Sequence, residues 1–136
     1  MQTFTPSSAT LPRVDIYVYA TGNLMQAPLT VQIVELDDED RPVGVPLFST
    51  DVPANTATDA RGAVSLYPNL SGLDRERQYG LLLKSPGAAG GGNAWGFGYS
   101  DANLYALGFE RVSNDHGATW TTEVSGNRDL QFVTYR

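Results

Sequence analysis

Hydrophobic and polar residues alternate along this chain with a period of two, and the alternation recurs in short segments. In residues 13–20, for example, Val14, Ile16 and Val18 share one face. Because successive side chains of a strand point to opposite sides of a sheet, this pattern predicts a half-buried β-strand. Further strands are predicted at residues 29–36, 45–52, 62–67, 78–84, 93–101, 104–112, 119–124 and 129–135.

Turn signals separate these segments, and helical periodicity is hard to find. An acidic run at 37–40 followed by Arg41-Pro42 indicates a hairpin tip, and residues 85–92 are a loop rich in glycine. Residues 1–12 are predicted to be a lead-in segment, with a short edge strand at 3–5. The pattern predicts an all-β fold: an antiparallel β-sandwich of jelly-roll type with about nine strands. The length of 136 residues fits a single module over 1–136.

The strand predicted over Asn93–Asp101 has two different faces. Trp95, Phe97 and Tyr99 share one face with Asp101, whereas small residues occupy the other. Rings spaced about 6.5 Å apart along a strand form a flat apolar surface that can stack on sugar rings. The same pattern is typical of a core strand, and for Trp95 and Phe97 both interpretations stay open. Tyr99 and Asp101, nearest to the following loop, are the stronger candidates for ligand contact.

The most specific motif is the segment 113–120, S-N-D-H-G-A-T-W. It matches the Asp-box pattern S-x-D-x-G-x-x-W and so resembles a hairpin motif of sialidases and other secreted β proteins. Asp115 can bond turn amides, Gly117 admits a positive φ, and Trp120 can cover the turn. The motif therefore predicts a β-hairpin in which Trp120 is packed, and it does not indicate sialidase activity.

Candidate chemistry is sparse. His116, the only histidine, lies in a predicted turn without a neighbouring nucleophile. Glycosidases need two carboxylates across a cleft, and the spacing of the acidic residues selects no pair. Phosphate-loop, dinucleotide and zinc-ligand patterns are absent from the sequence. We therefore expect a protein that is not an enzyme, with a small lyase or glycosidase as a remaining alternative.

The sequence predicts no cofactor but leaves a structural Ca²⁺ ion open. The acidic tip at 37–40 offers oxygen ligands without the spacing of an EF-hand loop. Asp101 and Asp129 are two further candidate ligands.

The net charge of −6 argues against nucleic acid and anionic membranes as partners. It also disfavours a strongly anionic polysaccharide, although a local cluster of arginines can override the total. The chain has no cysteine, which excludes disulfides and thiolate metal sites. No apolar run is long enough to cross a membrane. We expect any export signal to belong to a longer parent chain.

The order of the segments is also informative. Q-T-F-T at 2–5 is followed by V-D-I-Y-V at 14–18, P-L-T-V-Q-I at 28–33 and Y-G-L-L-L at 79–83; the Trp95 strand, the Asp-box and D-L-Q-F-V-T-Y at 129–135 come next. This order resembles the non-catalytic β-sandwich modules appended to secreted bacterial polysaccharide-degrading enzymes. The resemblance implies a secreted jelly-roll module within a larger multidomain enzyme. Leu107 departs from the pattern, because a glycine is usual there.

The leading hypothesis is a non-catalytic carbohydrate-binding module that attaches such an enzyme to a polysaccharide or oligosaccharide. Binding would combine stacking on aromatic rings with hydrogen bonds to hydroxyl groups. The candidate site residues are Trp95, Tyr99, Asp101, Asn103 and Tyr105, with Asn93 and Arg111 as weaker additions. The alternative is a structural or adhesion spacer module of a bacterial surface or secreted protein, whose aromatic residues are all core.

Overall fold

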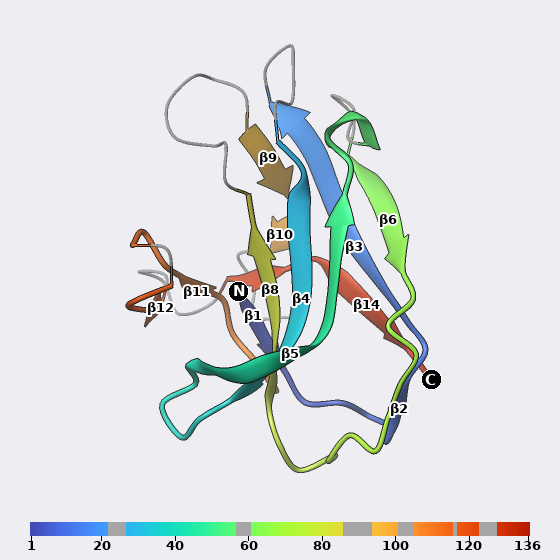
Figure 1. The fold of residues 1–136 in the computed structure, drawn as a ribbon, viewed down its shortest axis with the longest axis vertical. Helices are drawn as coiled ribbons and strands as arrows, with labels where there is room; N and C mark the ends of the chain where they lie inside the picture. Colours follow the sequence, from blue (N-terminus) through green and yellow to red (C-terminus); the bar gives the residue numbers. More distant parts are fainter. Residues whose placement is uncertain (22–26, 57–60, 86–93, 101–104, 116, 123–127) are drawn as a thin grey trace.

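A computed structural model describes residues 1–21, 27–56, 61–85, 94–100, 105–115, 117–122 and 128–136. Within them the chain forms fourteen β-strands and one 3₁₀ turn, η1 (Ala54–Thr56). Most of the long strands run roughly along the long axis of the molecule (Figure 1). The predicted all-β class is confirmed. Among the described residues, no helix has the length and apolar character needed to span a membrane.

The strands pair into several antiparallel sheets. The first four-stranded sheet has the order β1 (Gln2–Phe4), β8 (Tyr79–Lys84), β4 (Leu29–Leu36) and β5 (Pro42–Val52). The second has the order β14 (Phe132–Tyr135), β3 (Arg13–Thr21) and β6 (Gly62–Leu66), and β9 (Ala94–Phe97) also pairs with β3. Three two-stranded sheets pair β10 (Tyr99–Ser100) with β13 (Asp129–Leu130), β11 (Arg111–Val112) with β12 (Thr121–Thr122), and β2 (Thr10–Leu11) with β7 (Leu70–Ser71).

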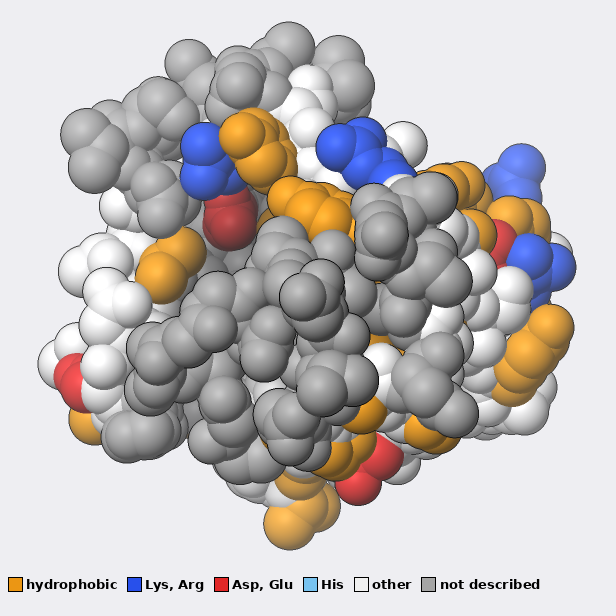
Figure 2. Space-filling model, turned by 90° about the horizontal axis from the view of Figure 1, so that it is seen from above, with side chains coloured by type: hydrophobic (Ala, Val, Ile, Leu, Met, Phe, Trp, Pro, Cys, Tyr) orange, Lys and Arg blue, Asp and Glu red, His pale blue; other side chains and the backbone are white. Residues whose placement is uncertain are grey.

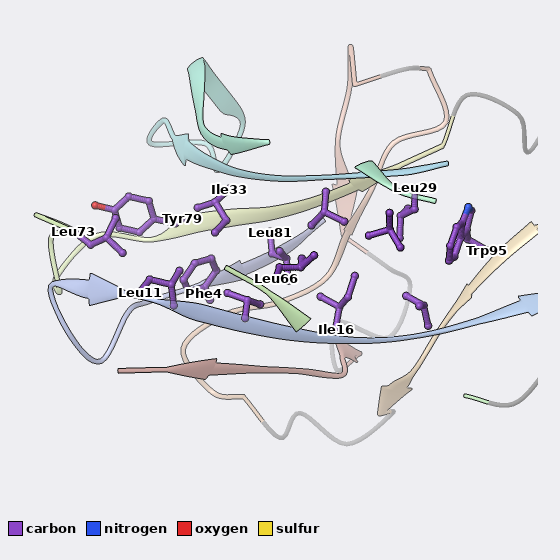
Figure 3. Packing of buried hydrophobic residues seen from close by; sticks show 14 residues of the cluster. Phe4, Leu11, Ile16, Leu29, Ile33, Leu66, Leu73, Tyr79, Leu81 and Trp95 are labelled. Atoms are coloured by element: carbon purple, nitrogen blue, oxygen red, sulfur yellow. The ribbon is translucent and has the colours of Figure 1, made fainter. Parts of the chain in front are cut away.

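The hydrophobic core lies between the two larger sheets (Figure 3). The predicted inward face of β3, formed by Val14, Ile16 and Val18, is buried. It meets buried residues of β4 and β8 such as Ile33 and Leu81. Alternation along each strand therefore produces two apolar faces that exclude water from one another, which is a sandwich-like arrangement.

The strand count exceeds the expected nine because β1, β2 and β7 lie outside the nine predicted segments, and because the strand predicted at 129–135 is divided into β13 and β14. β2 and β7 have only two residues each. Two residues are too few to show alternation in a sequence. The strand predicted at 93–101 is also divided at Gly98. The strand predicted at 104–112 is wrong for residues 105–110, of which none belongs to a named strand; β11 contains only Arg111 and Val112.

Within the predicted lead-in at 1–12, the short edge strand expected at 3–5 is present one residue earlier as β1, at the edge of the first sheet, and the first four residues are buried. β1 pairs with β8 through Gln2↔Leu81 and its neighbours, and the N–H of Thr3 donates to the carbonyl of Phe109 at 3.0 Å. Local composition cannot indicate such a position, because burial here depends on segments distant in sequence.

The outer face of β3 carries a buried carboxylate, Asp15. Arg13 donates from Nε and Nη2 to its two oxygens at 2.8 and 2.7 Å, and the Tyr135 hydroxyl donates to Oδ2 at 2.8 Å. These hydrogen bonds, those of Arg13 foremost, lower the pKa of Asp15 from 3.8 to about 2. The charged form is therefore the one that the fold stabilises.

We expect the free energy of unfolding to fall as the pH drops from about 4 to about 2. In this window the unfolded chain binds a proton at Asp15 that the folded chain does not, so lowering the pH favours unfolding. Asp115, whose pKa is also lowered to about 2, acts in the same window. Urea titrations from pH 2 to pH 6 measure the slope. The Asp15→Asn variant should show a shallower slope, and an unchanged slope would contradict the assignment.

Candidate functional site

An open groove of about 520 Å³ lies along β14 and is called the β14 groove below. It is lined by residues of β10, β13 and β14 together with side chains from two other segments. The lining residues are Arg61, Tyr99, Ser100, Tyr105, Asp129, Leu130, Gln131, Phe132, Val133 and Thr134. The groove thus unites Tyr99 and Tyr105, two of the residues predicted for the site.

The groove forms where two strands leave the second sheet. β14 and β9 both pair with β3, β14 along residues 13–16 and β9 along residues 18–21. At the junction between them, the N–H of Gly98 donates to the Tyr17 carbonyl at 2.8 Å, and the N–H of Gln131 donates to the Gly98 carbonyl at 2.7 Å. Beyond the junction, the segment that follows β9 pairs with the segment that precedes β14, as β10 with β13. This divergence places Tyr99 beside Leu130 on the groove wall.

Tyr99 presents an aromatic surface to solvent at the groove. Its side chain is 45% exposed, and the guanidinium carbon of Arg128 lies 4.1 Å from the ring centroid. A cation over the ring face is favourable and restricts the motion of the ring. The exposed part of the ring remains available to a ligand.

Tyr105 is half-buried and rigidly held. Its ring packs edge-on against Phe132, with the centroids 5.6 Å apart. Its hydroxyl donates to the Thr5 carbonyl at 2.8 Å and accepts from the Thr5 N–H at 3.0 Å. Burial raises the pKa of the Tyr105 hydroxyl, which therefore stays protonated at neutral pH. The ring borders the groove, and its hydroxyl is already engaged in two hydrogen bonds with Thr5.

Asp129 lies at the base of the groove and is only 5% exposed. Its Oδ1 accepts from Gln2 Nε2 at 3.0 Å, and its Oδ2 accepts from the Tyr105 N–H at 2.9 Å. Gln2 Oε1 in turn accepts from the Leu130 N–H at 2.9 Å. This buried network connects β1 to β13 and holds the backbone of Tyr105 in place through its N–H. Asp129 is therefore a positioning residue.

Arg61 and Gln131 supply exposed polar groups at the groove. Arg61 Nη1 donates to Gln131 Oε1 at 3.3 Å, and no carboxylate of the described residues forms an ion pair with Arg61. A Cβ at Gly98 would lie 2.7 Å from Gln131 Oε1 and 3.2 Å from Arg61 Cδ, so glycine makes room for both side chains. A guanidinium and an amide side by side can donate to and accept from sugar hydroxyls.

Trp95 does not belong to this surface. It is 7% exposed, its Nε1 donates to the Ala27 carbonyl at 3.0 Å, and it lies at one end of the core beside Leu29 (Figure 3). Phe97 packs against the same cluster. Of the two interpretations of this strand, the core interpretation is the one that the structure supports for both rings. Trp95 as an exposed stacking platform is corrected.

Of the remaining predicted residues, the structure describes only Arg111. Asp101 and Asn103 lie outside the described residues, as do Asn93 and His116. Arg111 pairs with Asp40 at 3.1 Å and lies over the ring of Phe109. The weaker candidate Arg111 is therefore engaged with the acidic tip, away from the groove lining.

The acidic tip is held by arginines. Asp37 accepts from the N–H of Glu39 and from the N–H and side chain of Arg41, bonds that lower the pKa of its carboxyl. No group of three or more potential metal ligands occurs in the part of the chain that the structure describes. The expectation of no cofactor, with a structural Ca²⁺ ion left open, stays a prediction.

The Asp-box forms the predicted hairpin, with β11 paired to β12. Asp115 accepts from the N–H and hydroxyl of Thr119 at 2.9 and 2.6 Å, and Gly117 has a φ of 91°. Trp120 covers the turn and packs against a small cluster of Met1, Val34 and Leu36. The structural role predicted for the motif is confirmed in the described residues.

Sequence reasoning missed Arg61, Ser100 and Gln131 as groove residues. Gln131 carried the clearest signal, since it is polar between Leu130 and Phe132 and so belongs to the face opposite theirs. Arg61 lies between the strands predicted at 45–52 and 62–67, where no local pattern distinguishes it. Only the junction of three strands brings these side chains together.

Basic and hydrophobic side chains also lie next to one another on the upper face of the molecule (Figure 2).

Comparison of the chain with protein-family models, curated proteins and solved structures found no match. The functional argument therefore rests on the geometry of the groove.

Proposed function

We propose that this protein is a non-catalytic carbohydrate-binding module that binds a polysaccharide or oligosaccharide in the β14 groove. The observation that carries the proposal is the exposed ring of Tyr99 in an open groove that also presents Arg61 and Gln131. Sugars have C–H faces that pack on aromatic rings and hydroxyls that bond to amide and guanidinium groups. The groove volume of about 520 Å³ lies within the range of small-molecule sites.

The wider setting of the module belongs to the same proposal. We infer an antiparallel β-sandwich of jelly-roll type, secreted as part of a larger polysaccharide-degrading enzyme. The sandwich-like core and the Asp-box hairpin support this inference, as does the resemblance in segment order. The module would hold the parent enzyme on its substrate without taking part in the chemistry.

Binding by the groove should be weak. A solvated sugar exchanges hydrogen bonds with water for those with the protein, and only the surplus contributes to affinity. We expect a dissociation constant between about 1 μM and 1 mM. Linked modules in a parent enzyme would raise the effective affinity through avidity.

A structural or adhesion spacer is the second candidate. The burial of Trp95 and the packing of Phe97 favour it, because core packing alone accounts for these two rings. It does not account for the exposed ring of Tyr99. The two candidates differ in whether any glycan binds.

Affinity gel electrophoresis tests the proposal. The wild type, Tyr99→Ala and Arg61→Ala would be run in gels containing xylan, mixed-linkage β-glucan, galactomannan, polygalacturonate or alginate. We expect one polymer to retard the wild type and Tyr99→Ala to weaken this binding about fivefold, since a stacking contact contributes about 1 kcal/mol.

The matched control is Val45→Ala, because Val45 is 84% exposed on β5 and does not line the groove. It should bind as the wild type does. Urea midpoints equal to that of the wild type would show that the variants remain folded. If none of the polymers retards the wild type, the spacer is the better account.

A further inference from the structure

The β14 groove continues onto the outer face of the second sheet. Gln131 and Val133 line the groove, and Tyr135 follows them on the same face because side chains alternate along β14. In the register with β3, Val133 lies opposite Asp15 and Tyr135 lies opposite Arg13. Gln131, Val133 and Tyr135 thus form a track on the outer face that begins in the groove. Tyr99 lines the same groove from the opposite face, because it is paired with Leu130.

The far end of this track carries two exposed rings on either side of a cation. The guanidinium carbon of Arg13 lies 4.4 Å from the Tyr135 ring centroid. On β6, Leu66 is buried opposite Val14, so the next residue, Tyr67, falls on the outer side beside Arg13. Tyr67 is 60% exposed and Tyr135 is 38% exposed. These three residues, Tyr67, Arg13 and Tyr135, are called the tyrosine end.

Tyr135 and Arg13 are held in place before any ligand arrives. Both side chains donate to the carboxylate of Asp15, as described above. Side chains that are already ordered lose little conformational entropy on binding. The charge of Arg13 is offset by Asp15, so the tyrosine end presents rings and bonded polar groups rather than a bare charge.

The length of the track sets the size of the ligand. Four residues of extended strand separate Gln131 from Tyr135, which corresponds to about 13 Å. This separation exceeds what a disaccharide spans. A ligand that filled the groove beside Tyr99 and also reached the tyrosine end would be an extended chain that passes from the groove onto the outer face and follows β14.

We propose that the tyrosine end is a second subsite for the same glycan, and that the ligand is a linear chain of on the order of four or more sugar units. The inference rests on the proposed function of the β14 groove. The track carries the polar groups of Gln131 and Arg13 beside the apolar surfaces of Val133 and the tyrosine rings, which suits the C–H faces and hydroxyls along a sugar chain.

Chain-length dependence tests the inference. The polysaccharide that retards the wild type would be hydrolysed, and fragments of about two and about six units would be titrated by isothermal calorimetry. We expect the wild type to bind the longer fragment at least about tenfold more tightly. Tyr67→Ala should weaken binding of the longer fragment about fivefold and leave the shorter one unchanged. Tyr67→Phe retains the ring and should bind both fragments as the wild type does.

The outcomes separate the two proposals. Equal affinity for both fragments, or unchanged binding of the longer fragment by Tyr67→Ala, would overturn the second subsite; loss of binding in Tyr99→Ala would still support the groove. Absence of any glycan binding by the wild type would overturn the proposed function and the inference together. Tyr67 suits this test because its exposed ring is not one of the donors to Asp15.

Discussion

Replacing Trp95 by alanine is expected to lower the free energy of unfolding by about 3–5 kcal/mol. The side chain is buried at the end of the core and its indole N–H donates to the Ala27 carbonyl. The substitution removes apolar contacts, leaves a cavity and strands a carbonyl acceptor. Urea denaturation followed by circular dichroism measures the loss as a lower midpoint.

Trp95→Phe is the matched control, because it keeps an apolar ring and removes mainly the indole hydrogen bond. It should destabilise the protein by about 1–2 kcal/mol. If Trp95→Ala kept the wild-type midpoint but lost sugar binding, the ring would be a ligand platform and the core assignment would fail.

Replacing Asp129 by alanine is expected to cost about 3–5 kcal/mol of stability. The carboxylate accepts from the side chain of Gln2 and from the N–H of Tyr105, and both donors are left without their acceptor in the variant. Because this network positions Tyr105, and Tyr105 lines the groove, sugar affinity should fall together with stability. Urea denaturation and gel retardation of the same samples measure the two effects.

Asp129→Asn tests whether the loss follows from the carboxylate itself. An amide retains one acceptor oxygen, so this variant should be destabilised less than Asp129→Ala. Wild-type stability in Asp129→Ala would show that water replaces the network and that Asp129 does not position Tyr105.

Several elements were predictable because their cause is local. β4 was predicted at its observed bounds, and β3 was predicted to within one residue, since long alternating segments with one buried face leave a clear pattern. The Asp-box hairpin was predictable for a similar reason: Asp115, Gly117 and Thr119 interact within a few residues of one another.

Other features depend on residues far apart in the chain. β1 is buried because it pairs with β8 and because Phe109 accepts from Thr3, more than one hundred residues away. Tyr105 was predicted in a strand, yet bonds to Thr5 and Asp129 hold it outside any named strand. No local pattern encodes such partners.

Period-two burial and turn chemistry act over a few residues, so the all-β class, the alternating strands and the Asp-box hairpin could be predicted from the sequence. It also identified Tyr99 and Tyr105 as residues of interest. In contrast, the packing of distant strands makes Trp95 a core residue while Tyr99, four residues later, is exposed. At Gly98 the chain exchanges its pairing with β3 for pairing with β13. The side of a strand that meets water depends on which strands pack against it, and those strands come from distant parts of the chain.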